Sequence, residues 1–553
     1  MLKNQKMANQ IVVMINTLID ASTELYKAAA DKDYILCNAI CTDMMGVLES
    51  IRGQAQQITQ EIKEVNIDIA LESVIYSLKR INTYFNTRSI NIFNKIEFEL
   101  IPLLQDMLMR FYFWCCVYPD VDKMQKYYTE EVVELAMNSY IDSMDESDDY
   151  KYELSVIVVA YNKLEYTKLC VENILNYIPK NINYELILVN HGSSDGTKEY
   201  FESLAPTKQL DIYKNGGGLL AYLKIVEGKY TLAVSNDVLV TENAIENMMK
   251  CIKSDDKIAM IVPSTPNVSN LQSIPAKYDS LETMFEFAKA NNVYNTNRHE
   301  QRVRLCNPIA LVRSSYIFSS KGICNHGFLF TKNENSFPDD LCAMLIRRKG
   351  WKMILQKDAY CYHFGSITIS SDINKFQEQT KQDFYLEGRK AFYYAFGIDP
   401  WGVGFCYSQS LLNLLDCNNT GKVNILGINC GLGSNPLKIK EFIKENNGNK
   451  NVKIFNITDD TILVNDLKSV SDAVLLESDY NRIFVAFPNH KFDYVIIENP
   501  IENKIFIKDF IRNISKRLVQ NGRIAINIKN SNISSEIMQI YKNAKICDDW
   551  IVI

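Results

Sequence analysis

The sequence of 553 residues contains no run of apolar residues long enough to cross a membrane. A spanning helix needs about 20 consecutive apolar residues. The most apolar stretch, residues 100–118, is interrupted by Pro102, Asp106 and Arg110. The first 20 residues are broken by Asn, Thr and Asp, unlike the apolar region of a secretory signal. We therefore expect neither a transmembrane segment nor a signal peptide.

The sequence also lacks an excess of basic residues and any regular pattern of cysteines. Its 60 Lys and Arg and 66 Asp and Glu give a formal net charge of −6, which argues against a nucleic-acid partner. The 14 cysteines include no CxxC pair and form no regular framework. Scattered cysteines of this kind favour reduced thiols and a cytoplasmic location.

The composition that remains is that of an ordinary globular protein, with 47% apolar residues and enough length for about three domains. Residues 1–142 carry apolar residues three and four positions apart and predict an all-helical domain. The acidic segment SMDESDDY (143–150) predicts a linker. Residues 151–400 and 418–553 alternate between strand-like and helix-like runs and predict two α/β domains. The helical domain is expected to be either a structural bundle or a surface for docking or dimerisation.

Polar and acidic residues follow strand-like runs in the middle of the chain. The run LSVIVVAYN (Leu154–Asn162), a helix-like segment and a second strand (Tyr184–Asn190) predict the start of a βαβ unit. A third strand ends at Asn236 and Asp237. Open α/β sheets bind ligands at the carboxyl ends of their parallel strands, so this edge is a predicted ligand site.

Five segments, in this order, resemble family 2 glycosyltransferases of the GT-A fold. They are SVIVVAYN, VNHGSSDGT, EGKYTLAVSND, LCNPIALVRSSYI and FPDDLCAMLIRRKGWKMILQKDAYCYHFGS. The resemblance covers about residues 152–370. It implies a central nucleotide-sugar-binding domain that transfers a sugar with inversion and uses a divalent metal, Mn²⁺ or Mg²⁺.

The resemblance assigns the metal to Asp237 and His363. Asp237 stands at the final aspartate of the family's DxD-type motif, while Ser235 replaces the acid at its first position. His363 matches a His that the family often has, and imidazole is an acceptable ligand for Mn²⁺. A divalent cation would neutralise the charge that develops on the departing nucleotide diphosphate. In the alternative interpretation, Asp237 is a strand-end turn residue and His363 a packing residue.

The resemblance assigns catalysis to Asp339 and Asp340. The acceptor hydroxyl must lose its proton as it attacks, so a carboxylate must lie within hydrogen-bond reach of it. The family's acid-Leu pattern favours Asp339 as the base and Asp340 as the residue that begins the helix. Pro338 stands where an acid is common, so the register leaves both open. Capping of the helix is the structural alternative for either residue.

The resemblance also outlines the pocket for the donor nucleotide. Its residues are Ala160, Tyr161, Asn162, Asn190, His191, Asp195, Asn236 and Gly217. Asn190 stands where the family usually has an acid, and its amide can still hydrogen-bond the imide edge of uracil, so uridine is the favoured base. Gly217 lies in a glycine run that would either let the backbone approach the donor or form a flexible loop.

Residues 421–553 resemble a Rossmann-like, class I S-adenosylmethionine-dependent methyltransferase domain. The segments KVNILGINCGLGSNPLKIKEFI, FDYVIIENPIE and NGRIAINI carry this resemblance. Gly431 and Gly433 would let the backbone approach the cofactor.

The same domain departs from the methyltransferase pattern in its first motif. Gly427 replaces an acid and Asn429 replaces a glycine, while the ribose-binding acid is either Asp459 or Asp460. We therefore expect S-adenosylmethionine to bind weakly or not at all. A Rossmann-like domain kept for packing or recognition is the alternative.

Together these patterns predict a cytoplasmic, metal-dependent inverting glycosyltransferase. It would move a hexosyl or N-acetylhexosaminyl group from a nucleotide sugar, with UDP favoured, to a protein acceptor such as flagellin or to a surface glycan. One alternative is a bifunctional glycosyl- and methyltransferase. The other is a non-catalytic scaffold or glycan-recognition protein on decayed enzyme folds, which Ser235, Asn190 and Gly427 suggest.

Overall fold

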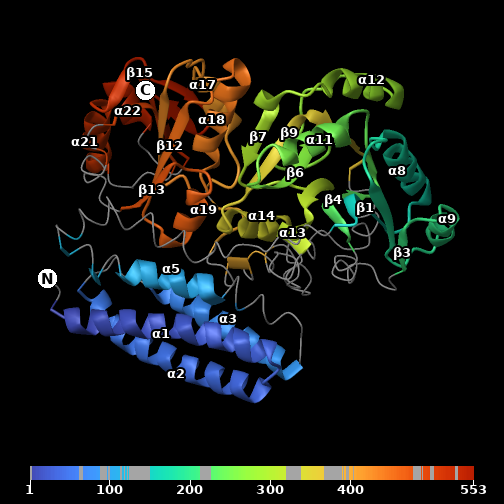
Figure 1. The fold of residues 1–553 in the computed structure, drawn as a ribbon. Helices are drawn as coiled ribbons and strands as arrows, with labels where there is room; N and C mark the ends of the chain where they lie inside the picture. Colours follow the sequence, from blue (N-terminus) through green and yellow to red (C-terminus); the bar gives the residue numbers. More distant parts are fainter. Residues whose placement is uncertain are drawn as a thin grey trace.

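A computed structural model shows three parts: an N-terminal helical bundle, a central α/β domain and a C-terminal α/β domain (Figure 1). The two α/β domains lie side by side, and the bundle lies along one side of the pair. The predicted α/β class with N-terminal helices is confirmed. The residues that the structure describes are 3–61, 67–87, 96, 100–112, 115–116, 119–120, 123, 150–211, 226–318, 338–365, 386, 389, 392–393, 398–402, 404–477, 487, 490–498, 504–529 and 534–553.

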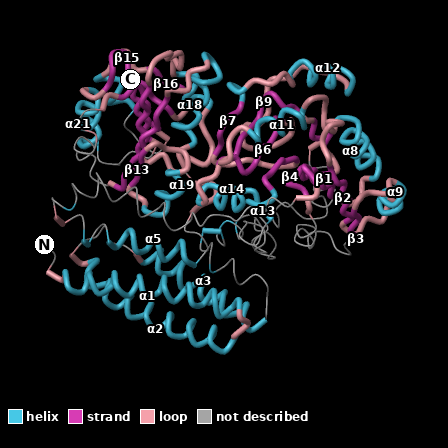
Figure 2. Tube along the Cα trace, viewed as in Figure 1, coloured by secondary structure: helices cyan, strands magenta, loops and turns pink. Residues whose placement is uncertain are grey.

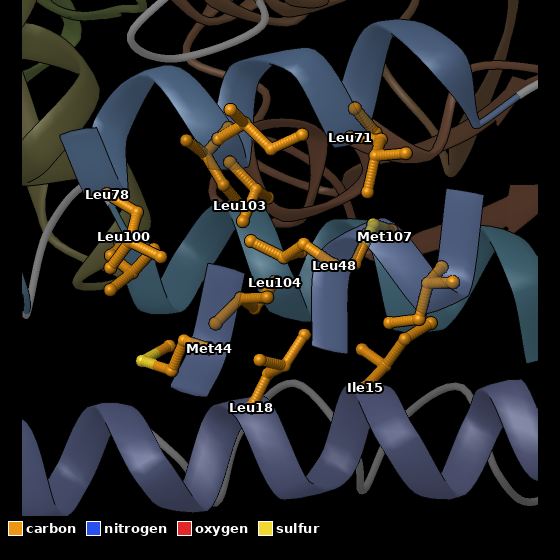
Figure 3. Packing of buried hydrophobic residues seen from close by; sticks show 14 of the residues in the cluster. Ile15, Leu18, Met44, Leu48, Leu71, Leu78, Leu100, Leu103, Leu104 and Met107 are labelled. Carbon is orange, nitrogen blue, oxygen red and sulfur yellow. The ribbon is translucent and has the colours of Figure 1, made fainter. Parts of the chain in front are cut away.

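Long amphipathic helices form the N-terminal bundle. They are α1 (Gln5–Ala30), α2 (Tyr34–Thr59), α3 (Asp68–Thr87) and α5 (Ile101–Tyr112). Apolar side chains three or four positions apart on these helices are buried in one core. Figure 3 shows Ile15 and Leu18 of α1 in this core together with Leu48 of α2 and Leu104 of α5. The three- and four-residue spacing of apolar residues in the sequence therefore corresponds to the buried side of each helix.

Helix α2 begins at a defined cap and contains a long apolar stretch. The Asp33 carboxylate accepts a hydrogen bond from the Leu36 amide at 3.0 Å, which satisfies a free donor of the first turn. Among the described residues, α2 is also the one helix whose length and mean hydropathy, 1.2 over its most apolar window, would suffice to cross a membrane. Its Met44 and Leu48 are buried in the bundle core.

The central domain is built on an eight-stranded mixed sheet with the order β3-β2-β1-β4-β8-β6-β9-β7. Its strands are β1 (Tyr152–Ala160), β2 (Tyr184–Asn190), β3 (Lys208–Asp211), β4 (Gly228–Ser235), β6 (Ile258–Ser264), β7 (His299–Arg302), β8 (Ile309–Arg313) and β9 (Lys352–Tyr360). Strands β1 to β4 are parallel, and β8 runs antiparallel to β4. After β1 the chain moves outward through β2 and β3 and then returns to β4. The switch point of the topology, where such sheets bind ligands, therefore lies between β1 and β4.

Helices cover both faces of the central sheet (Figure 2). Helices α8 (Leu164–Tyr177) and α11 (Ala244–Lys253) pack on one face, and α14 (Pro338–Arg348) packs on the other. Successive strand residues point to opposite faces, so Val156 and Val158 join the first core and Ile157 joins the second. The remaining elements are α9 (Thr197–Ser203), β5 (Val238–Leu239), α12 (Leu281–Asn291), η5 (Thr296–Arg298), α13 (Ser314–Phe318) and β10 (Tyr362–His363).

The C-terminal domain has a seven-stranded sheet with the order β13-β12-β11-β14-β15-β17-β16. Its elements are α17 (Gln409–Leu414), β11 (Val423–Ile428), α18 (Ser434–Asn447), β12 (Val452–Thr458), η7 (Thr461–Leu463), α19 (Val464–Lys468), β13 (Ala473–Leu476), β14 (Phe492–Ile497), α21 (Lys504–Ser515), β15 (Leu518–Asn527), α22 (Ser534–Ile540), β16 (Lys545–Cys547) and β17 (Trp550–Val552). The first five strands are parallel and doubly wound, and β17 runs antiparallel to β15. Its switch point lies between β11 and β14. Helix α17, which lies before residue 418, packs against β16 and β17 of this sheet.

Candidate active site

The first part of the site is the carboxyl edge of β1 and β4. The Asn236 side-chain amide donates to the Asn162 carbonyl at 3.0 Å and to the Thr167 hydroxyl at 2.9 Å. These bonds tie the end of β4 to the loop after β1 and to α8. Asn236 was predicted to bind the donor; the structure engages its side-chain NH₂ in holding the two strand ends together. Asp237 follows directly at this edge.

Asp237 and His363 lie together, as the resemblance implied. β10 pairs with β5 in antiparallel register, which sets His363 opposite Val238. The imidazole Nε2 lies 3.4 Å from the Asp237 carboxylate, and both side chains are at most 9% exposed. The Phe364 amide donates to the Asp237 carbonyl at 3.0 Å, and the Asn267 amide donates to the His363 carbonyl at 3.0 Å. Backbone pairing therefore fixes the pair.

The Asp237–His363 pair fits a divalent cation as a partial ligand set. A carboxylate and an imidazole are both ligands that Mn²⁺ accepts. The nitrogen that would bind the ion is Nε2, which faces the Asp237 carboxylate; Nδ1 is buried on another side of the ring, without a hydrogen-bond partner among the described residues. Within the described ranges no group of three or more His, Cys, Asp or Glu could hold a metal ion. A metal at Asp237 and His363 would need ligands beyond these two side chains, and the oxygens of a nucleotide diphosphate and of water are of the kind that divalent cations accept.

The second part of the site is the first turn of α14, which carries Asp339 and Asp340. The Arg304 guanidinium binds the Asp340 carboxylate with two contacts, Nε to Oδ1 at 2.6 Å and NH2 to Oδ2 at 3.0 Å. Asp340 is therefore held as one member of a bidentate ion pair. Asp339 is half-buried and accepts a hydrogen bond from the Cys306 thiol. Of the two carboxylates, Asp339 has the less strongly held side chain.

The environment of α14 also changes how these acids titrate. Burial and the neighbouring charge of Asp340 raise the pKa of Asp339 to about 6. Burial raises the pKa of Asp340 as well, against the opposing charges of Arg304 and Arg347. A carboxylate with a raised pKa is a stronger base at neutral pH than an exposed Asp.

The backbone brings the two parts to the same edge of the sheet. The Ser235 amide donates to the Pro308 carbonyl at 2.8 Å, and Ile309 pairs with Val234. Cys306, two residues before Pro308, contacts Asp339. The metal pair after β4 and the acids of α14 therefore flank one short segment, residues 306–308. This link between them was not predicted from the sequence.

The predicted donor residues after β2 are mostly engaged with their own loops. The Asn190 side chain donates to Asp211 at 2.9 Å and accepts from the Ser193 amide at 2.9 Å. The Asp195 carboxylate accepts from the Leu164 amide at 2.9 Å and from the Thr197 hydroxyl at 2.6 Å. Burial opposes ionisation of Asp195, but these hydrogen bonds outweigh it and lower its pKa. These contacts give both residues a structural role, and their contact with a donor stays a prediction.

The other residues that were predicted to bind the donor lie in different places: in the core, at the edge of the sheet and outside the described residues. The Ala160 side chain is in the core, and its carbonyl accepts from the His191 amide at 2.9 Å. Asn162 links two loops, because its amide donates to the Ser193 hydroxyl and its side chain accepts from the Ser194 amide. Tyr161 is half-buried beside it. Gly217 lies outside the described residues.

Sequence reasoning missed three residues that shape this site. Arg304 binds Asp340, Gln272 makes two hydrogen bonds to the Cys306 backbone, and Asn267 holds the His363 carbonyl. Neither Gln272 nor Asn267 lies in a recognisable motif. The basic run around Arg304 is a visible signal, but nothing in it identifies Asp340 as its partner.

Comparisons with known proteins identify the segment that carries this edge. The profile of the family described as "Glycosyl transferase family 2" matches residues 155–306. Residues 155–306 form a family 2 glycosyltransferase domain. The match contains Asp237 and the switch point between β1 and β4. It stops before α14 and before His363.

Two curated relatives match part of this domain. "Glycosyltransferase GlyG" of Streptococcus pneumoniae serotype 4 is 31% identical over 115 residues, which are 20% of this chain and 38% of that protein. "Minor teichoic acid biosynthesis protein GgaB" of Bacillus subtilis is 33% identical over 108 residues, 18% of this chain and 12% of that protein. The chain thus spans less than two-fifths of the length of these relatives.

Solved structures similar to this chain include two glycosyltransferase complexes. "Mannosyltransferase PcManGT from Pyrobaculum calidifontis in complex with GDP-Man and Mn2+" is 17% identical, with a TM-score of 0.28 over 39% of this chain and 57% of that one. "S. aureus TarS 1-349 in complex with UDP" is 17% identical, with a TM-score of 0.28 over 44% of this chain and 72% of that one.

Outside the glycosyltransferase domain, the glycine turn after β11 is the second predicted site. Gly431 and Gly433 both adopt positive φ, and Gly433 begins α18. The whole turn is buried. Gly433 packs tightly, because a Cβ there would lie 3.1 Å from Leu467 and 3.2 Å from Val470. The turn is thus built as the sequence suggests, but it faces the protein.

A segment of the chain's own backbone covers the start of α18. The Ser434 amide and hydroxyl both donate to the Gly404 carbonyl, and the Ser408 amide donates to Asn435 at 2.8 Å. A Cβ at Gly404 would lie 1.9 Å from the Cys430 carbonyl oxygen, so the two backbones are in direct contact. The amide at the helix start, which a bound anion would use, is satisfied internally.

The acid expected after β12 is also engaged. Asp459 is the residue that follows this strand, and it exchanges two hydrogen bonds with the Asn429 side chain. Asn429 Nδ2 donates to the Asp459 carboxylate at 3.3 Å, and the Asp459 backbone amide donates to Asn429 Oδ1 at 3.2 Å. Asn429, which replaces a motif glycine, thus contacts the acid that would hold a ribose. After β14, Glu498 is buried and accepts from Asn435 at 2.8 Å, and burial raises its pKa to about 8. The C-terminal switch point is therefore lined by residues that bind one another.

Proposed function

We propose that this chain is a metal-dependent inverting glycosyltransferase that uses a nucleotide-diphosphate sugar. The observation that carries the proposal is that the Asp237–His363 pair and Asp339 both flank residues 306–308 at the carboxyl edge of the family 2 domain. Asp237 and His363 could hold a cation at the leaving diphosphate, and Asp339 could accept the proton of the attacking hydroxyl. Both lie where an open α/β sheet presents its ligand.

In this proposal, Asp237 and His363 would hold the divalent cation. The cation, when bound, would neutralise negative charge on the nucleotide diphosphate as it leaves. The protein's own contribution is to hold the carboxylate and the imidazole in place. The β5–β10 pairing and the bond from Asn267 do so without relying on a ligand. Preorganised groups of this kind need no rearrangement during reaction.

Asp339 is the base that we favour. Its carboxylate would accept the proton of the acceptor hydroxyl while that oxygen attacks the anomeric carbon. The raised pKa supports this role, since a carboxyl with a pKa of about 6 is ionised at neutral pH yet accepts a proton readily. Asp340, bound to Arg304, would fix the start of α14 and keep the neighbouring carboxylate in position.

The proposal also includes the nucleotide of the donor and the class of the acceptor. A uridine nucleotide remains the favoured donor on the resemblance to the family. For the acceptor, the relative named as a minor teichoic acid biosynthesis protein favours a surface polymer over flagellin. A cytoplasmic location is consistent with the cysteines, since those in the described part of the chain are free thiols.

A donor screen by thermal shift tests the proposal directly. The full chain would be heated with UDP-, GDP- and CDP-sugars, each with Mn²⁺ and with a chelator instead. A ligand at about 100 times its dissociation constant adds about 2.7 kcal/mol to the stability of the folded state. We expect a metal-dependent rise with one nucleotide class and slow release of the nucleoside diphosphate. If no nucleotide sugar stabilises the protein or is hydrolysed, the non-catalytic scaffold is the better interpretation.

We further propose that the C-terminal domain does not bind S-adenosylmethionine. The support is the cover that Gly404 forms over the start of α18 and the bonding of Asp459 to Asn429. A bifunctional glycosyl- and methyltransferase would need this turn to be open. The domain would then have a role other than methyl transfer, and its contact with α14 is a starting point for identifying that role.

A further inference from the structure

Helix α14 connects the proposed active site to the C-terminal domain. Its first turn carries Asp339 and Asp340, and its last turn carries Arg347 and Arg348. A helix transmits the position of one end to the other, because its backbone hydrogen bonds make it a stiff rod over a few turns. Whatever holds the last turn of α14 therefore also sets the place of Asp339.

The last turn of α14 is held by Asp466 of α19, in the C-terminal domain. Arg347 Nε donates to Asp466 Oδ1 at 2.9 Å, and Arg348 Nε donates to Oδ2 at 3.1 Å. The Asp466 side chain is 0% exposed, and the two arginine side chains are 5% and 8% exposed. Buried charges are tolerated only when they are paired, so these contacts fix the positions of Asp466, Arg347 and Arg348, called the Asp466 triad below.

Arg347 also couples the Asp466 triad to Asp340 by a second route. Its NH1 donates to the Val303 carbonyl. The next residue, Arg304, binds the Asp340 carboxylate at the other end of the helix. Both ends of α14 are thus fastened to residues 303–304, and the C-terminal domain fastens one of them again through Asp466.

The segment that carries Asp466 is itself held by the N-terminal bundle. Val464 and Leu467, on either side of Asp466, belong to the buried core of the bundle, and Ile462 belongs to the core that contains α14. Helix α5 contacts η7. Helix α14 contacts α19, and the two helices are neighbours in Figure 1. All three parts of the protein therefore meet at residues 461–468.

We propose that Asp466 is a positioning residue through which the C-terminal domain orients α14 and, with it, Asp339. Asp466 reaches the reaction only through Arg347 and Arg348. The inference rests on the proposed glycosyltransferase function. It gives the C-terminal domain a role in turnover that needs no cofactor of its own.

The test compares Asp466→Asn with the wild-type full chain, with Mn²⁺ and the nucleotide sugar that the wild-type protein hydrolyses fastest. We expect kcat for donor hydrolysis to fall about 10- to 100-fold, since a misplacement of about 1 Å can cost 10²-fold. The dissociation constant of the donor should change less than about twofold, because the proposed donor and metal residues lie on other elements. Asp466→Glu should restore most of the lost turnover.

The pH profile supplies a readout that loosened packing alone would not move. The Asp339–Asp340 pair faces the charges of Arg304 and Arg347 and the thiol of Cys306. Without Asp466, the charge of Arg347 is less neutralised and stabilises the carboxylates. The acidic limb of kcat should therefore move to lower pH in Asp466→Asn.

Lys438→Gln is the matched control at the same domain interface. Lys438 of α18 pairs with Glu300 of β7 at 2.7 Å, and Glu300 keeps Arg302 and Lys357 as partners when Lys438 is removed. This variant should keep kcat within about twofold of wild type and leave the pH limb in place. An equal loss in Lys438→Gln, or an unchanged kcat in Asp466→Asn, would refute the role of Asp466.

The remaining outcomes are also decisive. If Asp466→Asn fails to fold, Arg348→Gln tests the same contact, because it removes one partner and leaves Arg347 in place; we expect a smaller loss of kcat, about 3- to 10-fold, with donor affinity unchanged. Normal turnover of a folded Arg348→Gln would then overturn the inference. If the wild-type protein neither binds nor hydrolyses any nucleotide sugar, the proposed function fails and this inference fails with it.

Discussion

The protein contains two doubly wound sheets that differ in what lies at their switch points. In the central sheet, the edge between β1 and β4 presents Asp237 beside His363, and the imidazole has a buried nitrogen without a partner in the described chain. In the C-terminal sheet, the edge between β11 and β14 is covered by the segment around Gly404. The two edges have the same topology and opposite availability.

This difference shows that a binding topology is not yet a binding site. The glycine turn of the C-terminal domain has the positive φ angles that close approach of a ligand would need. Its amide at the start of α18 nevertheless bonds to a carbonyl of the same chain. At the central edge, a carboxylate and an imidazole lie 3.4 Å apart, close enough for one cation to bind both. Availability of these groups, rather than strand order, separates the two.

The largest effect is expected when Asp237, the carboxylate of the proposed metal pair at the central edge, is replaced. Asp237→Asn should abolish transfer and the Mn²⁺-dependent part of donor binding, because a neutral amide cannot replace an anionic ligand. Calorimetry with and without Mn²⁺ and an assay of diphosphate release would measure this. Asp256→Asn, at an exposed carboxylate in the same domain, is the control and should behave as wild type. Full metal-dependent activity in Asp237→Asn would remove Asp237 from the metal role.

The next effect separates the two acids of α14. Asp339→Asn should lower kcat by roughly 10² to 10⁴ with donor affinity little changed, which is the usual scale for a general base. Asp340→Asn should instead lower the free energy of unfolding, because it leaves the partly buried Arg304 without its carboxylate. Steady-state kinetics and urea denaturation of both variants would decide. If the two effects are exchanged, Asp340 is the base.

The pH dependence should follow the raised pKa of Asp339. The base works as its anion, so kcat should fall about tenfold per pH unit below pH 6. For stability the sign is opposite: the folded-state pKa lies above the ordinary 3.8, so the stabilisation from the protonated form is present below pH 3.8 and is lost as the pH rises through 6. Rate profiles and denaturation between pH 4 and 8 would check both. A kcat that stays constant down to pH 5 would contradict the assignment.

A smaller effect tests the cover over the C-terminal edge. Gly404→Ala should lower the free energy of unfolding by about 1 to 3 kcal/mol, because Gly404 has a φ of +73° and its new Cβ would meet the Cys430 carbonyl. Gly421→Ala is the matched control, since no heavy atom lies within 4 Å of a Cβ there and its φ lies outside the left-handed range. Urea denaturation would compare them. Equal stabilities would mean that Gly404 does not press on the glycine turn.

The last prediction is that S-adenosylmethionine has no effect on the stability of the protein. S-adenosylmethionine at about 1 mM should leave the melting temperature unchanged, since only a ligand that binds the folded state raises it. The same experiment with a donor nucleotide and Mn²⁺ is the positive control. Micromolar binding of S-adenosylmethionine by calorimetry, lost in Gly431→Val, would make the two edges equivalent and the protein bifunctional.

Much of the fold follows from local patterns in the sequence. Apolar residues at helical spacing predicted the bundle, and β-branched runs such as Leu154–Ala160 predicted the central strands. These patterns work because burial of one face leaves a fixed period in the sequence. Helix α17 (Gln409–Leu414) lies before residue 418, the expected start of the last domain, and with 6 residues it is too short to show a clear period.

The proximity of two candidate site residues could be predicted from the sequence, while their roles stay predictions. Asp237 and His363 were expected together and lie 3.4 Å apart. Asn190 and Asp195 were expected to face a donor; their side chains bond to neighbouring loops, and their contact with a donor stays a prediction. A polar residue at a strand end has both options, and the choice depends on partners that the local sequence does not identify.

The sequence by itself determined the elements, their order and the acids at the strand ends, because these depend on residues close together in the chain. Only the tertiary structure decided which groups are engaged. Arg304 meets Asp340 across 36 positions, Ser434 meets Gly404 across 30, and Arg347 meets Asp466 across 119. Such contacts leave no period or motif, since each forms only when separate elements pack and a buried polar group takes the partner within reach.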